Sequence, residues 1–261
     1  MYNFHKIISL TLHSSYKSVS DILKGLEFKK FLLEQTRSDF YKGEKLLFNR
    51  NNIAAVKHFE RAAKSGNPIA KFRLGCIYQH GKGGIQKDEK KAIEYLTMAA
   101  TQGYSKAQLW LGNMLINDES NKISAIEWYK LAAEQKNTQT LYNLALCYRD
   151  GKVVKKNENK AILLFTKAAE QGHPEAQFEL GVWFENARNF KDNFLSNDMK
   201  KLTKICKSLN ISIDGDKNLI LQRISFFWFK KSSDNGFEPA EKKLAYETFK
   251  ARYKEIKEIR K

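Results

Sequence analysis

Hydrophobic residues between Ala70 and Gly103 recur every three or four positions in two separate blocks. In the first block Ala70, Leu74 and Tyr78 share one helical face, and in the second block the same spacing continues up to Gly103. Glycines beginning at Gly81 separate the two blocks and interrupt a helix. This pattern predicts two consecutive antiparallel helices joined by a short turn.

The same pair of blocks returns several times along the chain. The small residue of the first block stands at Gly75, Gly112, Ala145 and Gly181, so the period is 33 to 37 residues. Repeats of this length predict a stack of two-helix units, each of which buries its apolar face against its neighbours. The second block ends in two small residues in every copy: Ala62-Ala63, Ala99-Ala100, Ala132-Ala133, Ala168-Ala169 and, in the last copy, Ser232-Ser233.

Small residues at these positions allow two helices to cross at close range, while large residues beside each crossing fill the remaining volume. The aromatic residues Tyr78, Tyr95, Trp128 and Tyr148 fall at such neighbouring positions. We therefore interpret them as packing residues rather than as ligand contacts. The chain has three prolines and no long alternating run of β-branched residues, so the sequence predicts an all-α protein.

The consensus of the two blocks is Ala-x-x-x-Leu-Gly-x-x-Tyr-x-x-Gly, followed by Lys-Ala-x-x-aromatic-x-x-x-Ala-Ala-x-x-Gly. It resembles the Sel1-like repeat, a relative of the tetratricopeptide repeat, from Phe40 to Ala240 apart from one insertion. The resemblance implies a right-handed α-solenoid of antiparallel two-helix repeats that serves as a protein-binding scaffold. The family motif contains no catalytic residue, so the resemblance implies none in this chain.

The repeat register divides the chain into five segments. The junction at Ala176 returns at Ala240, which is 64 residues later and nearly twice the normal period, so an insertion interrupts the last repeat. We expect an N-terminal helical cap, four complete repeats with the first helix of a fifth, an inserted helix-turn-helix hairpin, the second helix of repeat five, and a C-terminal capping helix. In that order they cover residues 1–36, 37–185, 186–223, 224–239 and 240–261.

The inserted segment has a helical stripe, a turn with an Asp-Gly pair, and the start of a second stripe. It resembles the SAP motif, a helix-turn-helix hairpin often found in DNA- and chromatin-associated proteins. Lys207, Lys217 and Arg223 are then the candidate nucleic-acid contacts, although Asp214 and Asp216 would repel a phosphate at the same turn. DNA binding and a structural or partner-contacting hairpin both stay open, and the acidic turn favours the second.

Composition adds a strong positive charge, because 46 Lys and Arg against 29 Asp and Glu give a formal net charge of +17. Such a charge is compatible with a polyanion site, with an acidic protein partner whose encounter it would speed, and with a generally basic surface that has no dedicated ligand. The chain has no long block of like charge, which favours the generally basic surface.

The three cysteines, Cys76, Cys147 and Cys206, are odd in number and far apart in the sequence. This use of cysteine favours a reducing compartment over a disulfide framework. The N-terminal apolar run, residues 7–12, is shorter than a secretory signal requires, and no segment has the length of a membrane span. We therefore expect a cytoplasmic protein without a membrane span.

Motifs of common enzymes, such as Gly-x-Ser-x-Gly, His-Glu-x-x-His and the phosphate loop, do not occur in the sequence. The run Gly81-Lys-Gly-Gly resembles a phosphate cradle superficially, but it stands at the inter-helix turn of a repeat. His80 and His173 stand alone beside turns, and the spacing of cysteine and histidine fits no metal site. We expect a non-enzymatic protein with no cofactor.

Related solenoids bind partners on the concave face formed by the first helices of successive repeats, so the positions of these helices outside the core stripe are the candidate partner contacts. They are Arg73, Ile77, His80, Trp110, Met114, Asn143, Arg149, Glu179 and Trp183. Trp110 and Trp183 are the strongest candidates, because large flat side chains with a polar edge dominate binding energies. Packing of either tryptophan on a neighbouring repeat stays the alternative.

These observations predict an adaptor that binds another protein. Three settings remain open. The first is a bacterial interaction protein, including an immunity protein that masks a toxic effector, because members of the resembled family occur beside such toxins. The second is a nucleic-acid-associated adaptor that uses the inserted hairpin, and the third is a regulatory scaffold in a eukaryotic or parasite cell.

Overall fold

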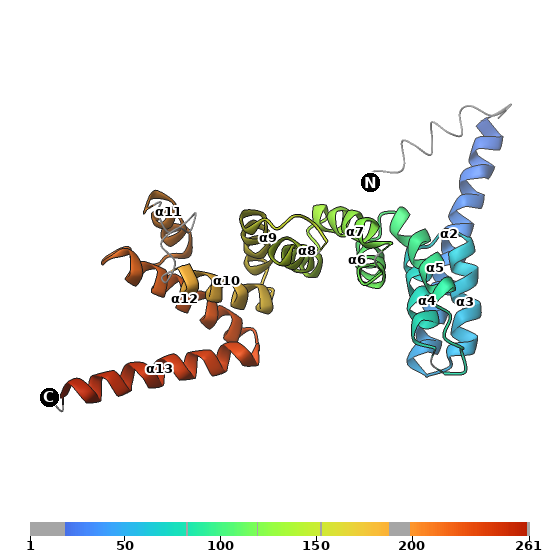
Figure 1. The fold of residues 1–261 in the computed structure, drawn as a ribbon. Coiled ribbons are helices and arrows are strands. Elements are labelled where there is room, and N and C mark those ends of the chain that lie inside the picture. Colours follow the sequence, from blue (N-terminus) through green and yellow to red (C-terminus); the bar gives the residue numbers. More distant parts are fainter. Residues whose placement is uncertain (1–18, 82, 119, 152, 188–198, 260–261) are drawn as a thin grey trace. The chain divides into compact units, whose positions relative to one another are not determined.

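The computed structural model describes residues 19–259 except 82, 119, 152 and 188–198 (Figure 1). Every regular element in these residues is a helix. The helices are α2 (Val19–Phe48), α3 (Asn52–Lys64), α4 (Pro68–His80), α5 (Glu89–Thr101), α6 (Ser105–Leu115), α7 (Lys122–Glu134), α8 (Thr138–Asp150), α9 (Glu158–Glu170), α10 (Pro174–Ala187), α11 (Met199–Leu209), α12 (Lys217–Asp234) and α13 (Glu238–Ile259). The predicted all-α class and the predicted succession of short helices are confirmed.

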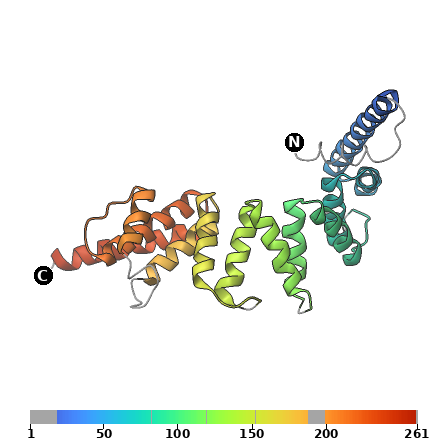
Figure 2. The ribbon, with the colours of Figure 1, turned by 90° about the horizontal axis from the view of Figure 1, so that it is seen from above.

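The chain divides into two compact units, residues 1–107 (unit 1) and residues 108–261 (unit 2). Within each unit, helices such as α4 and α5 or α8 and α9 pack as antiparallel neighbours in chain order, as the green-to-yellow helices of unit 2 show in Figure 2, whereas α10 packs on α12. This is the packing of a helical solenoid, in which each repeat contacts its neighbours in the chain. Across the described parts of both units, no helix combines the length and the hydrophobicity that crossing a membrane requires.

In four of the five repeats the first helix crosses the second helix at a glycine. The four are Gly43, Gly75, Gly112 and Gly181. A Cβ atom at Gly75 would lie 2.7 Å from the Leu96 side chain, and one at Gly43 would lie 2.6 Å from the Phe59 ring, so neither position has room for a side chain. The approach at Gly43 identifies the C-terminal part of α2 as the first helix of repeat one.

Polar caps and left-handed glycines fix the ends of the first helices. Asn67 and Asn137 accept hydrogen bonds from backbone amides in the first turns of α4 and α8. Gly81 and Gly151 follow the same two helices with φ of 61° and 69°, a conformation that costs free energy for a residue with a Cβ atom. The glycine turn of the consensus therefore has a defined role in stopping the first helix.

Two of the four segment boundaries expected from the sequence fall well inside continuous helices, whereas the other two, at 185/186 and 239/240, lie within two residues of an end of α10 and α13. The boundary between residues 36 and 37 lies within α2, and residues 1–18 of the expected cap lie outside the described part of the chain. The boundary between residues 223 and 224 lies within α12. Neither glycine nor proline occurs in residues 31–42 or 217–234, so nothing in these stretches interrupts a helix.

Aromatic residues fill the space beside the helix crossings. Tyr78 and Tyr95 stack beside the core of unit 1 with ring centroids 5.9 Å apart and an interplanar angle of 2°. Lysines from the first turn of the second helices cover equivalent rings in both units. Lys91 Nζ lies 5.2 Å from the ring centroid of Tyr78, and Lys160 Nζ lies 5.2 Å from that of Tyr148. The interpretation of these tyrosines as packing residues agrees with their positions.

Repeat five keeps its helix pair although the insertion separates the two helices in the sequence. Helices α10 and α12 pack on each other as the helix pairs of other repeats do. Two buried serines of α12 bond to the backbone of α10: Ser225 Oγ donates to the Gly181 carbonyl at 2.8 Å, and Ser232 Oγ donates to the Pro174 carbonyl at 2.7 Å. These bonds fix α12 on α10 at two points.

Helix α11 and the start of α12 form the predicted helix-turn-helix hairpin. After α11 the Ile211 amide donates to the Cys206 carbonyl at 2.8 Å. Asp216 caps α12, since its Oδ1 accepts a hydrogen bond from the Leu219 amide at 2.8 Å. Residues 188–198, which lead into the hairpin, lie outside the described part of the chain.

Candidate protein-binding surface

In unit 1, helix α4 carries three of the predicted partner contacts: Arg73, Ile77 and His80. Arg73 forms a bidentate ion pair with Glu44 of α2, with Nε–Oε1 at 2.7 Å and Nη2–Oε2 at 2.8 Å. His80 is exposed at the C-terminal end of α4. Ile77 is buried in the core of unit 1, so its prediction as a partner contact is corrected to a packing role.

In unit 2 the two tryptophans predicted as the strongest contacts are both half-buried. Trp110 of α6 packs against the hydrophobic cluster that includes Tyr129. Trp183 of α10 packs against the core of repeats four and five and meets Phe184 edge to face, with ring centroids 5.0 Å apart. Met114, one turn after Trp110, is half-buried as well. Each tryptophan therefore contributes to packing and keeps part of its surface accessible.

Side-chain amides connect α6 with α8. Asn113 Oδ1 accepts hydrogen bonds from Tyr129 OH at 2.7 Å and from Asn143 Nδ2 at 3.0 Å. Asn143 Oδ1 in turn accepts a hydrogen bond from Gln139 Nε2 at 3.1 Å. The predicted contact Asn143 is thereby held in place, together with Asn113 and Gln139, which the sequence analysis did not identify.

Ion pairs connect α8 with α10 and α10 with α13. Arg149 Nη1 lies 2.8 Å from Glu179 Oε1, and Arg149 Nε donates to Asp150 Oδ1 at 2.8 Å. Lys243 Nζ lies 2.8 Å from Glu185 Oε1 and 3.6 Å from a carboxylate oxygen of the next turn of α13. Partial burial opposes the charge on Lys243, but these carboxylates outweigh it and raise the pKa of the ammonium group.

One register position, two residues before the small residue of each first helix, makes most of these connections. A polar side chain there bonds to the preceding first helix in the same unit. The pairs are Arg73 with Glu44 in unit 1, and Asn143 with Asn113, Glu179 with Arg149, and Lys243 with Glu185 in unit 2. Successive first helices are therefore joined through side chains that lie at their surface.

The side chain of His173, which stands at the turn before α10, is buried against α8. Its ring stacks on Tyr142 with centroids 4.7 Å apart, and its Nε2 lies 3.2 Å from Gln139 Oε1. Its Nδ1 lies 3.4 Å from the Ala176 amide and 3.1 Å from Glu175 Oε2. Burial lowers the pKa of His173, against the opposing charge of Glu175.

The three candidate nucleic-acid contacts occupy different environments in the hairpin. Lys207 is exposed in the last turn of α11, and Lys217 is the first residue of α12. Arg223 Nη1 donates to the backbone carbonyls of Ser212 at 3.2 Å and Asp214 at 2.6 Å. The Arg223 guanidinium therefore bonds to the turn of the hairpin through Nη1.

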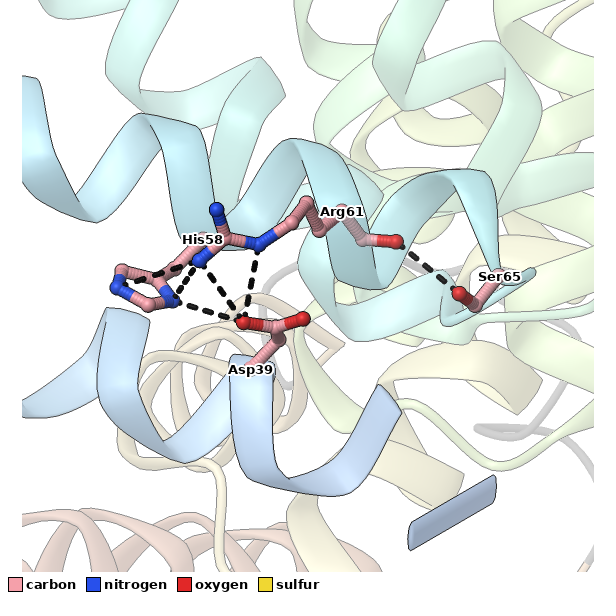
Figure 3. Close-up of polar contacts among 4 residues, drawn as sticks. All are labelled: Asp39, His58, Arg61 and Ser65. Atoms are coloured by element: carbon pink, nitrogen blue, oxygen red, sulfur yellow. Dashed lines mark hydrogen bonds and ion pairs between the residues drawn. The ribbon is translucent and has the colours of Figure 1, made fainter. Parts of the chain in front are cut away.

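Unit 1 also holds a charged cluster between α2 and α3 (Figure 3). Asp39 Oδ1 lies 2.8 Å from His58 Nδ1 and accepts hydrogen bonds from Arg61 Nε and Nη2 at 3.1 Å. Burial would raise the pKa of Asp39, but the hydrogen bonds and charges of Arg61 and His58 outweigh it and lower the pKa below 3.8. The arrangement fastens the long helix α2 to α3.

Antiparallel helix pairs of a regular period, with bonded first helices, define a helical-repeat protein. The family model for the Sel1 repeat matches residues 41–67, 68–104, 105–137, 138–173, 174–188 and 216–237. The chain belongs to the Sel1 repeat family, as its repeat motifs predicted. Proteins of this family act as scaffolds or adaptors for other proteins.

The matched segments also clarify the insertion. The segment 216–237 contains Lys217 and Arg223, so both residues lie in the part of the chain that the repeat model covers. Residues 189–215, which include α11, lie between matched segments. The resemblance of this hairpin to the SAP motif stays a prediction.

Curated relatives share the repeats over part of their length. The chain is 27% identical to the DAP3-binding cell death enhancer 1 of Rattus norvegicus over 50% of this chain and 33% of the relative. It is 32% identical to the chitin synthase regulatory factor 3 of Schizosaccharomyces pombe over 54% of this chain and 16% of the relative. The chain thus spans a third or less of the length of these two relatives.

Solved structures show the same fold. A Sel1 repeat protein from Oxalobacter formigenes aligns with a TM-score of 0.60 and 24% identity, over 80% of this chain and 76% of that one. The protective antigen c5321 of uropathogenic Escherichia coli aligns with a TM-score of 0.58 and 24% identity, over 79% of this chain and 48% of that one. At this identity the similarity establishes the fold alone.

Proposed function

We propose that this chain is a non-enzymatic scaffold that binds another protein on the first-helix surface of unit 2. This surface is defined by the accessible side chains of α6, α8 and α10: Trp110, Asn113, Met114, Gln139, Asn143, Arg149, Glu179 and Trp183. The bonds between neighbouring first helices carry the proposal. They hold the polar side chains in fixed positions, so a partner would lose little side-chain entropy in contacting them.

The two tryptophans are the proposed anchors of the bound partner. A half-buried tryptophan with a packed base and an accessible edge is preorganised for contact and contributes a large apolar area. Arg73 and His80 of α4 are proposed as partner contacts of unit 1, where the Glu44 carboxylate fixes the Arg73 guanidinium. The buried Ile77 is not part of this proposal.

The test is affinity capture with the full chain as bait in cells that express it. Trp183→Ala and Trp110→Ala should each reduce the captured partner by about tenfold or more, as expected for a central aromatic anchor. Leu163→Ala is the matched control, because Leu163 is 56% exposed on the second helix α9 and lies outside the proposed surface.

Circular dichroism and thermal unfolding of the same variants separate binding from folding. Unchanged helicity with lost capture supports the proposal. Equal capture by the tryptophan variants and by Leu163→Ala would contradict it, and collapse of the fold in both tryptophan variants would assign the residues to the core.

The proposal leaves two biological settings for the scaffold. An immunity protein that masks a toxic effector and a regulatory scaffold of a eukaryotic or parasite cell would both use such a surface. Identification of the captured partner distinguishes them: a toxic enzyme supports the first setting, and a component of a regulatory complex supports the second.

A nucleic-acid-associated adaptor is the second candidate function. The net charge of +17 and the exposed Lys207 favour it, whereas the use of Arg223 by the hairpin turn weighs against it. For a nucleic-acid site, Lys207→Glu/Lys217→Glu should abolish tight binding of a labelled duplex and reduce its salt dependence. Weak binding that is equal in wild type and variant would exclude the hairpin as a nucleic-acid site.

A further inference from the structure

The first-helix surface of unit 2 differs in charge from the chain as a whole. Helices α8 and α10 contain four carboxylates, Asp150, Glu175, Glu179 and Glu185, but the single cation Arg149. The whole chain, in contrast, carries a net charge of +17. Helices α8 and α10 therefore carry a net negative charge, whereas the chain as a whole carries a net positive charge.

The cations at this surface do not neutralise its carboxylates. Arg149 contacts both Asp150 and Glu179, so that group of three charges keeps one negative charge. Lys243, one of several cations of α13, contacts both Glu185 and Glu247, so this group of three charges also keeps one negative charge. Glu175 contacts His173, and burial lowers the pKa of this histidine and so disfavours the cation that would neutralise the carboxylate.

An apolar row runs between these charged groups. The residue after the small residue of the first helix is Leu146 in α8, Val182 in α10 and Tyr246 in α13. Leu146 and Val182 are half-buried, and Tyr246 is 59% exposed. In α10, Glu179 and Glu185 stand three residues before and after Val182, so carboxylates lie on both sides of the apolar position.

We propose that this surface binds a basic polypeptide segment in which Lys or Arg side chains alternate with apolar ones. The proposal rests on the proposed function and assigns the chemistry of the partner. Apolar side chains of the segment contact Leu146 and Val182, while its cations contact the carboxylates of α8 and α10. Positive charges elsewhere on the chain act on such a segment weakly, because physiological salt screens exposed charges beyond about 8 Å.

The test uses the full chain and two fluorescein-labelled peptides of equal length, one of Lys, Leu and Ala and the other with Glu in place of Lys. In fluorescence anisotropy at physiological ionic strength, where charges elsewhere on the chain are screened, the basic peptide should bind more tightly than the acidic one despite the positive charge of the chain. Glu175→Gln/Glu179→Gln should weaken the basic peptide about fivefold or more, which corresponds to the loss of two exposed charge contacts.

Glu134→Gln/Glu170→Gln is the matched control, because it makes the same change of charge at exposed positions of the second helices α7 and α9. It should weaken binding less than about twofold. Equal weakening in both double variants would show a response to overall charge and overturn the proposal. Tighter binding of the acidic peptide would overturn it as well.

The basic-segment proposal can fail while the proposed scaffold function stands, and the variants distinguish the two cases. Loss of partner capture in Trp183→Ala, with full capture by Glu175→Gln/Glu179→Gln, would leave the scaffold function standing and refute the basic segment as its partner. Urea unfolding midpoints of the glutamate variants close to that of wild type ensure that binding, and not folding, is measured.

Discussion

At the scale of single residues, His173 holds the position at which Asn67 and Asn137 cap other first helices. Burial lowers its pKa below the ordinary value of 6.5. The unfolded chain therefore binds this proton more tightly than the folded chain. The stability that His173 contributes is complete above pH 6.5 and is lost as the pH falls below 6.5 toward the lower pKa of the folded state.

We expect the urea midpoint of the wild type to fall between pH 7 and pH 5, with at most about 1.4 kcal/mol lost from this group for each pH unit. His173→Asn keeps a capping side chain without a titratable ring and should remove this part of the pH dependence. His80→Asn, at an exposed position, is the control and should keep it. Identical pH profiles for wild type and His173→Asn would contradict the prediction.

Gly181 illustrates how a single methyl group can act against helix propensity. A Cβ atom there would lie 2.6 Å from the Phe229 ring, in a buried crossing where the ring has to move. Alanine would gain about 1 kcal/mol of helix propensity over glycine. We expect the steric cost to exceed this gain, so that Gly181→Ala lowers the free energy of unfolding by about 1–3 kcal/mol.

Ala145 supplies the comparison for that prediction, because repeat four already accommodates a Cβ atom at the equivalent position. Ala145→Gly should cost about 1 kcal/mol through helix propensity and a small loss of packing. Denaturant unfolding measures both variants. A Gly181→Ala protein that is more stable than wild type would show that the Phe229 ring yields without cost.

At the scale of elements, α10 and α12 are joined by hydrogen bonds from two serines, at positions where the other repeats have alanine. Ser225→Ala and Ser232→Ala introduce the alanine that other repeats have at these positions. Each substitution removes one hydrogen bond to a backbone carbonyl of α10, and that carbonyl remains part of its helix. Each should lower the free energy of unfolding by about 1 kcal/mol, the usual net value of such a bond. Ser208→Ala, at an exposed position of α11, should cost less than about 0.5 kcal/mol.

Hydrogen exchange of the α12 amides shows whether the effect is local. Faster exchange in α12 than in α8 and α9 is expected for both serine variants, because the bonds are confined to α10 and α12. An equal increase of the exchange rate in all helices of unit 2 would contradict a local effect of these hydrogen bonds.

The elements themselves were predictable because small residues, glycine turns and apolar stripes recur at a fixed period. The two boundaries inside α2 and α12 were not, because repeat register marks where units begin and not whether a helix continues through the junction. Gly43 was missed as a crossing residue since repeat one has lost the other consensus residues around it. Only the close approach of the Phe59 ring to Gly43 identifies this glycine as the crossing residue of repeat one.

The candidate surface was predictable in part for a similar reason. Asn143, Arg149 and Glu179 were identified from their positions on first helices. Their partners Asn113 and Gln139, and the ion pair between Glu185 and Lys243, require knowledge of which residue of one helix faces which residue of the next. Periodicity within a repeat does not contain that information.

At the scale of the whole molecule, the three cysteines are free: Cys76 and Cys147 lie in two different repeats, and Cys206 lies in α11 of the inserted hairpin. Burial raises the pKa of the Cys76 thiol to about 11 and raises those of Cys147 and Cys206 as well. At pH 8 about a thousandth of Cys76 would be thiolate, which is the reactive form. Native protein should therefore react slowly with a thiol reagent, and denatured, unreduced protein should react quickly at all three positions.

The control for that measurement is reduced and denatured protein, which should give the same count of three thiols. A smaller count without reductant would reveal an oxidised pair and contradict the reducing environment inferred from the spacing of the cysteines.

The bonds between successive first helices also bear on how such a chain can change during evolution. Deleting the repeat formed by α8 and α9 would place Asn113 opposite Glu179 and remove Arg149, the cation that Glu179 contacts. Duplicating that repeat would place the Asn143 of the second copy opposite the α8 helix of the first copy instead of opposite Asn113. Repeats joined in this way cannot be exchanged freely for one another. Each bond needs a matching pair of side chains on two successive first helices, so the two residues of a pair have to be conserved together.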